Sequence, residues 1–165
     1  MRRWLAIAGA TVAIAMVATG CGGKPSSSTS SSAPASSAAT ATGGATVAVK
    51  SSKLGAILVD GTGRTLYLFE KDQGTTSSCY GACAGGWPPD TTNGAPRAGA
   101  GVSASLLGTT TRTDGKTEVT YHGHPLYYFA GDQKPGDSNG EGLKAFGAEW
   151  YVLSAAGNKV EQEGS

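Results

Sequence analysis

Charged side chains are scarce in this chain of 165 residues, since Asp, Glu, Lys and Arg make up only 15% of it, against about 25% in an ordinary soluble protein. The 13 Lys and Arg nearly balance the 12 Asp and Glu. The sequence therefore has no basic surplus with which to bind nucleic acid. Three cysteines are too few for a cysteine-dense miniprotein. The apolar run at residues 4–17 is too short to span a hydrocarbon core of about 30 Å. One modest domain is the natural expectation.

The short apolar run predicts an export signal. Arg2 and Arg3 precede it and small residues follow it, which is the layout of a secretory signal peptide. Ala18-Thr19-Gly20-Cys21 resembles the lipobox of bacterial lipoproteins, with Ala18 where leucine is usual. The resemblance implies that residues 1–20 are removed and that Cys21 receives fatty acyl chains such as palmitate. We expect Cys21 to anchor the protein to the outer face of the bacterial cytoplasmic membrane. The alternative is an ordinary secretory signal that leaves Cys21 as a free thiol.

Residues 21–46 are predicted to be a flexible tether that begins at the lipidated cysteine. Beyond Cys21 they consist of Ser, Thr, Ala, Gly and Pro with Lys24 as the one charge. Such a segment cannot bury enough apolar surface to offset the entropy of ordering. A coil of about 25 residues spans roughly 25 to 30 Å, enough to hold a domain clear of the lipid headgroups.

Residues 47–162 are predicted to form a mainly β domain, a compact antiparallel sandwich-like unit of two related halves. Short apolar runs alternate there with Gly, Asp, Asn and Pro, as in a protein built from several short strands. The expected strands cover residues 46–50, 55–59, 65–69, 109–113, 117–122, 125–130 and 150–154.

Local residues predict two turns and one short helical turn. Asp60-Gly61-Thr62-Gly63 is expected to reverse the chain, and Asp114-Gly115 has the residues of a two-residue hairpin loop. Ser103 or Ser105 could cap a helical turn around Leu106 and Leu107.

One ten-residue pattern occurs twice, sixty positions apart. Residues 63–72 read GRTLYLFEKD and residues 123–132 read GHPLYYFAGD, and each copy is followed by a tryptophan after a Gly-rich loop. Two copies predict a pseudo-symmetric domain, with halves at about 54–90 and 117–157, which together complete one core; a solenoid would need at least three repeats.

The duplicated residues resemble a family of predicted bacterial lipoproteins with a Tyr-x-(Phe/Trp/Tyr)-x-x-Asp motif, also described as a secreted repeat of unknown function. The motif residues are Tyr67, Phe69, Asp72 and Trp87 in the first copy and Tyr127, Phe129, Asp132 and Trp150 in the second. The resemblance implies an exported, usually lipid-anchored bacterial protein, and it implies no known activity.

Strand geometry predicts where the motif side chains point. Tyr67 and Phe69 share one face of a strand and Leu66 and Leu68 the other, with the same arrangement in the second copy. Both faces are apolar, so we expect core packing for the aromatic rings. The two motif aspartates lie just past the strands, where a carboxylate commonly fixes a turn. The alternative is a site for a glycan or small polar ligand, made of tyrosine hydroxyls and aspartates from both halves.

Cys79 and Cys83 are predicted to form a disulfide. A separation of four residues lets one turn bring both thiols within bonding distance, and oxidation is the default in an exported protein. With Cys21 lipidated, the remaining cysteines form an even pair. A metal site of these cysteines with His122 and His124 is the alternative, although the histidine spacing does not suit a zinc finger.

No cofactor, metal ligand or catalytic residue is predicted. Residues 137–142 imitate the opening of an EF-hand loop, but Ala148 stands where a twelfth-position glutamate is needed, so a solvated loop is the ordinary interpretation. The sequence has no Gly-x-Ser-x-Gly and no phosphate-binding loop. We expect a lipid-anchored envelope protein that serves as a binding or structural module for an unknown envelope ligand or protein. The alternatives are a redox or metal-handling accessory protein and an envelope hydrolase.

Overall fold

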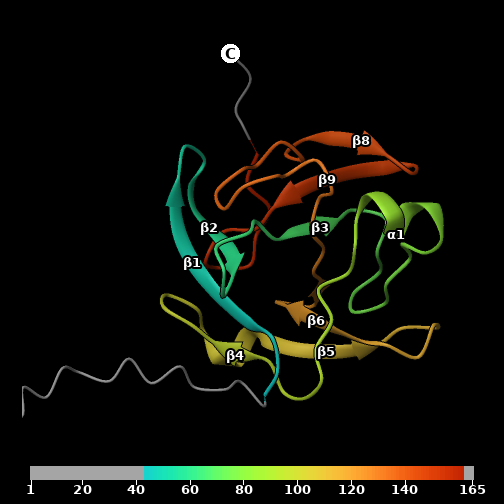
Figure 1. Cartoon of the computed structure of the whole chain (residues 1–165), viewed down its shortest axis with the longest axis horizontal. Coiled ribbons are helices and arrows are strands. Elements are labelled where there is room, and N and C mark those ends of the chain that lie inside the picture. The colour runs from blue at the N-terminus through green and yellow to red at the C-terminus, as the bar shows by residue number, and fades with distance from the viewer. Residues whose placement is uncertain (1–42, 162–165) are drawn as a thin grey trace, which may run out of the picture. The chain divides into compact units, whose positions relative to one another are not determined.

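The computed structural model describes residues 43–161, so the predicted signal peptide, Cys21 and most of the predicted tether lie outside the described residues. This part of the chain is mainly β, as predicted (Figure 1). Across residues 43–161, no helix is long and apolar enough to cross a membrane.

The described strands form three small sheets. The first has the order β2-β1-β4 and consists of β1 (Thr46–Ser52), β2 (Gly55–Asp60) and β4 (Arg97–Ala98). The second has the order β3-β9-β8 and consists of β3 (Tyr67–Phe69), β8 (Leu143–Ala145) and β9 (Ala148–Val152). The third has the order β5-β6-β7 and consists of β5 (Leu107–Thr111), β6 (Thr117–Tyr121) and β7 (His124–Pro125). Strands within each sheet pair antiparallel, except that β4 runs parallel to β1.

The motif segments separate two hydrophobic clusters, as their apolar faces predicted. Tyr67 and Phe69 pack in a cluster with the two motif tryptophans, whereas Leu66 and Leu68 pack in the other. The second copy has the same division, with Tyr127 in the first cluster and Leu126 in the second. The clusters cover both sides of each motif segment, which explains why neither face is polar.

The two copies interlock. β3 of the first copy pairs with β9 of the second, in a register that places Phe69 opposite Trp150. The second copy's motif segment lies in turn beside the first copy's tryptophan segment, through a bridge between Tyr127 and Pro89 and a hydrogen bond of 2.8 Å from Tyr128 N–H to the Pro88 carbonyl. Each copy therefore pairs its motif segment with the other copy's tryptophan segment.

The expected strand at 125–130 is wrong beyond its first residue. β7 ends at Pro125, and the rest of the segment forms only isolated bridges. The physical reason is the partner: Pro88 and Pro89 have no N–H to donate, so a regular ladder cannot form. In the corresponding pair, Tyr151 stands opposite Leu68 and has the backbone N–H that Pro88 lacks, and β9 is a full strand.

Other strands differ from prediction in their bounds or were not predicted. The strand expected at 109–113 is β5, displaced toward the N-terminus, and the one expected at 150–154 is β9, which pairs with the unpredicted β8. The unpredicted β4 covers the edge of β1. A helix α1 (Ala82–Gly86) was also not predicted, because Ala-Cys-Ala-Gly-Gly has weak intrinsic helix propensity.

The turn predictions had mixed outcomes. Asp60 reverses the chain as predicted, since its Oδ1 accepts hydrogen bonds from Thr62 N–H and Arg64 N–H at 2.8 and 2.9 Å. Asp114-Gly115 belongs to a three-residue loop, not a two-residue one, because Arg112 N–H donates to the Lys116 carbonyl at 2.9 Å.

The expected helical turn is a 3-10 turn, η1 (Ala104–Leu106). It begins after Ser103, but no serine side chain caps it: the hydroxyl of Ser103 pairs with that of Ser105 at 2.9 Å.

Candidate functional site

The two motif tyrosines lie side by side at the centre of the domain. Tyr67 N–H donates to the Tyr127 carbonyl at 2.9 Å, and Tyr127 N–H donates to the Tyr67 carbonyl at 3.0 Å. Both residues are fully buried. The two hydrogen bonds are equivalent, since each tyrosine donates its N–H to the carbonyl of the other. This reciprocal pair therefore lies at the pseudo-two-fold axis that relates the two copies.

Each tyrosine hydroxyl binds the motif aspartate of the other copy. Tyr67 donates to Asp132 Oδ2 at 2.7 Å, and Tyr127 donates to Asp72 Oδ2 at 2.7 Å. Burial raises the pKa of both tyrosines above its usual value, so both hydroxyls keep their protons. The groups that could have formed a ligand site are therefore bonded to each other.

The same aspartates also fix loops, as predicted. Asp72 Oδ1 accepts hydrogen bonds from the N–H and the hydroxyl of Ser78, both at 2.7 Å. Asp132 Oδ1 accepts from the N–H and the side-chain amide of Asn139 at 2.9 and 3.2 Å. Each aspartate thus joins the loop of its own copy to the tyrosine of the other.

The four other motif rings form one continuous stack that alternates between the copies. Phe69 lies on Trp150 with 3.9 Å between ring centroids, Trp150 on Trp87 with 4.0 Å, and Trp87 on Phe129 with 4.4 Å. Tyr67 meets the edge of Trp87 at 5.3 Å, and Tyr127 meets the edge of Trp150 at 5.2 Å. The aromatic residues are core residues, in agreement with the packing interpretation.

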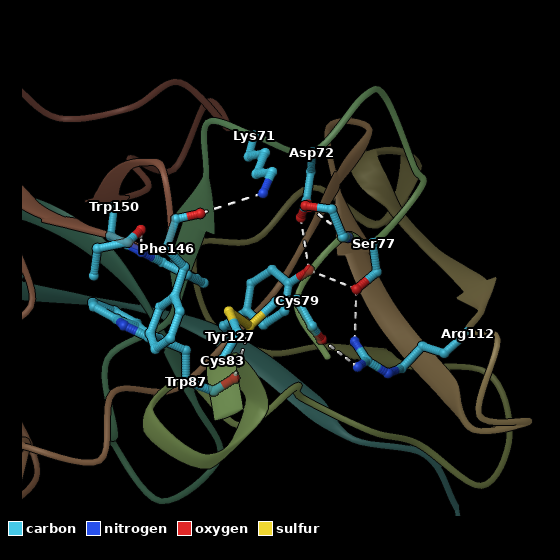
Figure 2. Close-up of a disulfide and its surroundings, with 12 residues drawn as sticks. Lys71, Asp72, Ser77, Cys79, Cys83, Trp87, Arg112, Tyr127, Phe146 and Trp150 are labelled. Atoms are coloured by element: carbon cyan, nitrogen blue, oxygen red, sulfur yellow. Dashed lines mark hydrogen bonds between the residues drawn. A yellow bond between two sulfur atoms is a disulfide. The ribbon is translucent and has the colours of Figure 1, made fainter. Parts of the chain in front are cut away.

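Cys79 and Cys83 form the predicted disulfide, with 5.2 Å between their Cα atoms. Figure 2 shows the bridge beside Trp87 and Tyr127. Cys79 is fully buried and Cys83 is 7% exposed. With both sulfur atoms oxidised and enclosed, neither is a free thiolate that could bind metal.

A buried ionic network lies next to the motif, and sequence reasoning missed it. Arg112 Nη1 donates to Glu118 Oε2 at 2.8 Å and to Ser77 Oγ at 2.6 Å, and Nη2 donates to the Cys79 carbonyl at 2.6 Å. Ser77 Oγ in turn lies 2.7 Å from the Tyr127 hydroxyl (Figure 2). The guanidinium therefore connects the disulfide loop, β6 and the motif tyrosine.

Glu118 stands where the other copy has an apolar residue. Glu118 bridges to Thr91, and the corresponding bridge of the other half joins Ile57 to Ser154. Ile57 and Glu118 are both buried, and Glu118 Oε1 has no hydrogen-bond partner among the described residues. Burial raises the pKa of Glu118, and the hydrogen bond and charge of Arg112 oppose that shift. Polar and apolar residues alternate along β6, which is the sequence pattern of a strand with one face in solvent. Only an alignment of Glu118 with Ile57 could have indicated that the Glu118 carboxylate is buried.

Asp90 is a second buried carboxyl in an apolar place. Val119 N–H donates to the Asp90 carbonyl at 2.8 Å, as Leu58 N–H donates to the Leu153 carbonyl at 2.8 Å. Asp90 thus takes the place of buried Leu153. Its Oδ1 accepts a hydrogen bond from the Tyr128 hydroxyl at 3.0 Å, and within residues 43–161 Oδ2 has no partner. Burial raises the pKa of Asp90 to about 6.

The histidines and the EF-hand-like loop have structural roles. His122 and Gly123 form the two-residue loop between β6 and β7, both at positive φ. Asp137 Oδ2 accepts hydrogen bonds from Gln133 N–H and Lys134 N–H at 3.0 Å each. Over the described range, no group of three or more His, Cys, Asp and Glu is placed to hold a metal ion.

The duplicated, interlocked arrangement agrees with a family match. A family described as a secreted repeat of unknown function matches residues 48–90 and 108–154, and each match contains one copy of the motif. The chain belongs to this family. It has no significant match among curated proteins or solved structures. In this secreted-repeat protein, the motif residues form the joint between two repeats.

Proposed function

We propose that this protein is anchored in the bacterial cell envelope by lipid on Cys21 and that its β domain is a binding or interaction module at the outer face of the cytoplasmic membrane. The single observation that supports the anchor most directly is Cys21 itself, at the end of a short apolar run, in a chain whose family is secreted. Each buried methylene contributes about 0.8 kcal/mol, so two or more acyl chains hold a protein stably.

The interior of the domain supports a binding role over a catalytic one. The motif tyrosines and aspartates are bonded to one another, and the motif rings pack as core. What the domain presents to partners is therefore its surface of loops and sheet edges, which is the usual place for recognition on a rigid scaffold.

Cysteine substitution tests the anchor. Cys21→Ala is expected to move the protein from the membrane fraction to the medium and to abolish labelling by an alkyne analogue of palmitate. The matched control is the double variant Cys79→Ala and Cys83→Ala, which keeps Cys21 and should remain labelled and membrane-bound. Membrane retention of Cys21→Ala would contradict the proposal.

A redox or metal-handling role is the second candidate, because the chain has a disulfide. That role needs a bridge which reagents or partners can reach, and both sulfurs are buried. Alkylation of the native protein followed by mass spectrometry distinguishes the two: the binding role expects Cys79 and Cys83 to stay unmodified, whereas two reactive thiols would favour redox or metal chemistry.

A further inference from the structure

A groove of about 550 Å³ lies between the β4 segment and the β5–β6 hairpin, where Thr117 of β6 also lines it. Ala95, Pro96 and Ala98 line one side of it, the last of these in β4. Leu107, Gly108 and Thr109 of β5 line the other side. No charged side chain lines the groove within the described part of the protein. Apart from Pro96 and Leu107, its walls consist of small residues, so another backbone could approach closely.

In the part of the chain that the structure describes, the side of β5 that faces away from β6 is an open strand edge. His122 N–H donates to the Leu106 carbonyl at 2.8 Å and Arg112 N–H to the Lys116 carbonyl at 2.9 Å. In an antiparallel ladder, hydrogen-bonded pairs alternate, so even-numbered residues here face β6 and Thr109 faces outward. Among residues 43–161, no strand pairs with this side of β5.

The other half of the molecule shows how such an edge is filled. β1 is the first strand of the first hairpin, as β5 is of the second, and the family matches begin at residues 48 and 108. β4 covers the edge of β1 as a parallel strand, with Val47 opposite Ala98. The pairing continues through a hydrogen bond of 2.8 Å from Val49 N–H to the Ala100 carbonyl.

The corresponding segment of the second half does not cover β5. After β9 the chain turns back on itself: Leu153 bridges to Lys159, and Val160 N–H donates to the Val152 carbonyl at 2.9 Å. Among residues 43–161, the edge of β5 therefore lacks the covering strand that its counterpart has.

The residues of β5, and those of the segment that covers β1, indicate what kind of strand could pair with the outer edge of β5. β5 reads Leu-Gly-Thr-Thr-Thr, without charge or proline, whereas the free edge strand β8 contains Lys144, a residue type that discourages strand addition. Apart from Arg97, which stands opposite Thr46, the segment on β1 is made of small residues, and a Cβ added at Gly99 would lie 2.9 Å from the Val47 carbonyl oxygen. A strand on such an edge must have a small side chain where it approaches the neighbouring backbone, as at Gly99.

We propose that β5 binds an extended, uncharged, small-residue segment of another polypeptide, which adds to its free edge as a parallel strand in the way that β4 adds to β1. The proposal deepens the proposed binding role and rests on it, but it is independent of the lipid anchor. Backbone hydrogen bonds would supply affinity, and the narrow, uncharged groove would select against charged or bulky segments.

A capped octapeptide tests the site. The probe is Ala-Pro-Ser-Ala-Gly-Ala-Gly-Val, the sequence of residues 95–102 with Arg97→Ser, because this sequence forms the equivalent pairing in the same fold. The protein is the chain from residue 21 to 165 with Cys21→Ser, so lipid plays no part. Titration followed by NMR is expected to show saturable shifts at Thr109 and Thr111. Amide exchange of Thr109 should slow by about tenfold or more at saturation.

Two variants and one altered probe make the result specific. Thr109→Pro removes an outward N–H and should lower affinity at least tenfold, while leaving the β5–β6 bonds in place. Ala98→Lys places a charge in the opposite wall and should also lower affinity, which keeps the test valid if Thr109→Pro fails to fold. Thr111→Ser retains the backbone donor and should bind normally. A probe methylated on alternate backbone nitrogens should not bind.

Three results would overturn the proposal. The first is no saturable change at Thr109. The second is slow exchange of Thr109 in the free chain that becomes fast when residues 22–42 are removed, which would make the chain's own N-terminal segment the occupant. The third is slow exchange that becomes fast on dilution, which would make the occupant a second copy. None of these results bears on Cys21, so they are separate from failure of the anchor.

Discussion

At the residue scale, Tyr127 shows how a buried polar group can join parts of a fold. Its hydroxyl lies 2.7 Å from both Asp72 Oδ2 and Ser77 Oγ. Through Ser77 it is also connected to Arg112. A buried hydroxyl must find partners because an unmade hydrogen bond in the interior costs free energy. Here those partners come from the other repeat, so one atom joins both halves.

Removing this hydroxyl should destabilise the domain. Tyr127→Phe is expected to lower the free energy of unfolding by about 1–3 kcal/mol, because Asp72 and Ser77 each lose a buried partner. Chemical denaturation followed by tryptophan fluorescence measures the change. Tyr151→Phe is the control, since the Tyr151 hydroxyl bonds Glu149 at the surface, and it should unfold as the wild type does. Equal stability of all three proteins would contradict the role given to Tyr127.

Asp90 should make stability depend on pH. Its pKa of about 6 in the folded state lies above the ordinary 3.8, so the folded protein holds this proton more tightly than the unfolded chain does. The stability that this proton contributes is complete below about pH 3.8 and is lost as the pH rises to about 6.

The comparison with Asp90→Asn isolates this effect, because every other group titrates equally in both proteins. From pH 4 to pH 7, the free energy of unfolding of the wild type should fall relative to that of Asp90→Asn by about 2–3 kcal/mol. Urea unfolding at the two pH values measures it. A constant difference would show that Asp90 titrates normally.

At the scale of elements, short loops and prolines determine where strands can form. His122-Gly123 makes a tight connection between β6 and β7 because both residues adopt positive φ, 50° and 83°. Pro88 and Pro89 prevent the second motif segment from becoming a strand although its sequence is strand-like. The repeats therefore have unequal secondary structure despite equivalent contacts.

Alanine substitutions at two glycines can distinguish the cost of backbone strain from the cost of a steric clash. An added Cβ would meet nothing within 4 Å at either Gly123 or Gly85. Gly123→Ala should nevertheless destabilise the domain by about 1 kcal/mol, because its φ of 83° is unfavourable for an L side chain. Gly85→Ala, within α1, should be neutral or stabilising by up to about 1 kcal/mol. Thermal unfolding of both variants measures the difference, and a shift of equal sign in both would refute the strain argument.

At the scale of the whole domain, interlocking makes the two repeats one cooperative unit. Each copy supplies rings, carboxylates and strand edges that the other copy needs, as in the alternating stack of Phe69, Trp150, Trp87 and Phe129. Neither half can bury its motif residues alone. We therefore expect that the repeats do not fold independently.

Unfolding should consequently occur in a single transition. Far-ultraviolet circular dichroism, which reports on all sheets, and tryptophan fluorescence, which reports on the central stack, are expected to give coincident curves. A fragment of residues 43–106 should lack cooperative unfolding when produced alone. Separate transitions, or a folded fragment, would contradict the single unit.

The repeat, the β class, the apolar character of both motif faces and the disulfide were all predictable from sequence, because each depends on residues close together in the chain. Residues 66–69 are all apolar and their side chains point alternately to the two faces of the strand, so both faces must be covered. A spacing of four residues permits the Cys79–Cys83 disulfide. The buried pair of Arg112 and Glu118 was not predictable in this way. Arg112 also donates to Ser77 and to the Cys79 carbonyl, which are more than thirty residues distant along the chain.

Local pattern alone predicted an export signal and determined a tether-like composition and a duplicated strand motif ending in an aspartate. Only the tertiary structure decided that each tyrosine bonds the other copy's aspartate, that Glu118 and Asp90 occupy apolar places, and that no strand within residues 43–161 pairs with the outer edge of β5. The physical reason is that hydrophobic periodicity predicts whether a side chain is buried, but it does not predict which segment of the chain packs against it. The choice of partner depends on how the whole chain closes around one core.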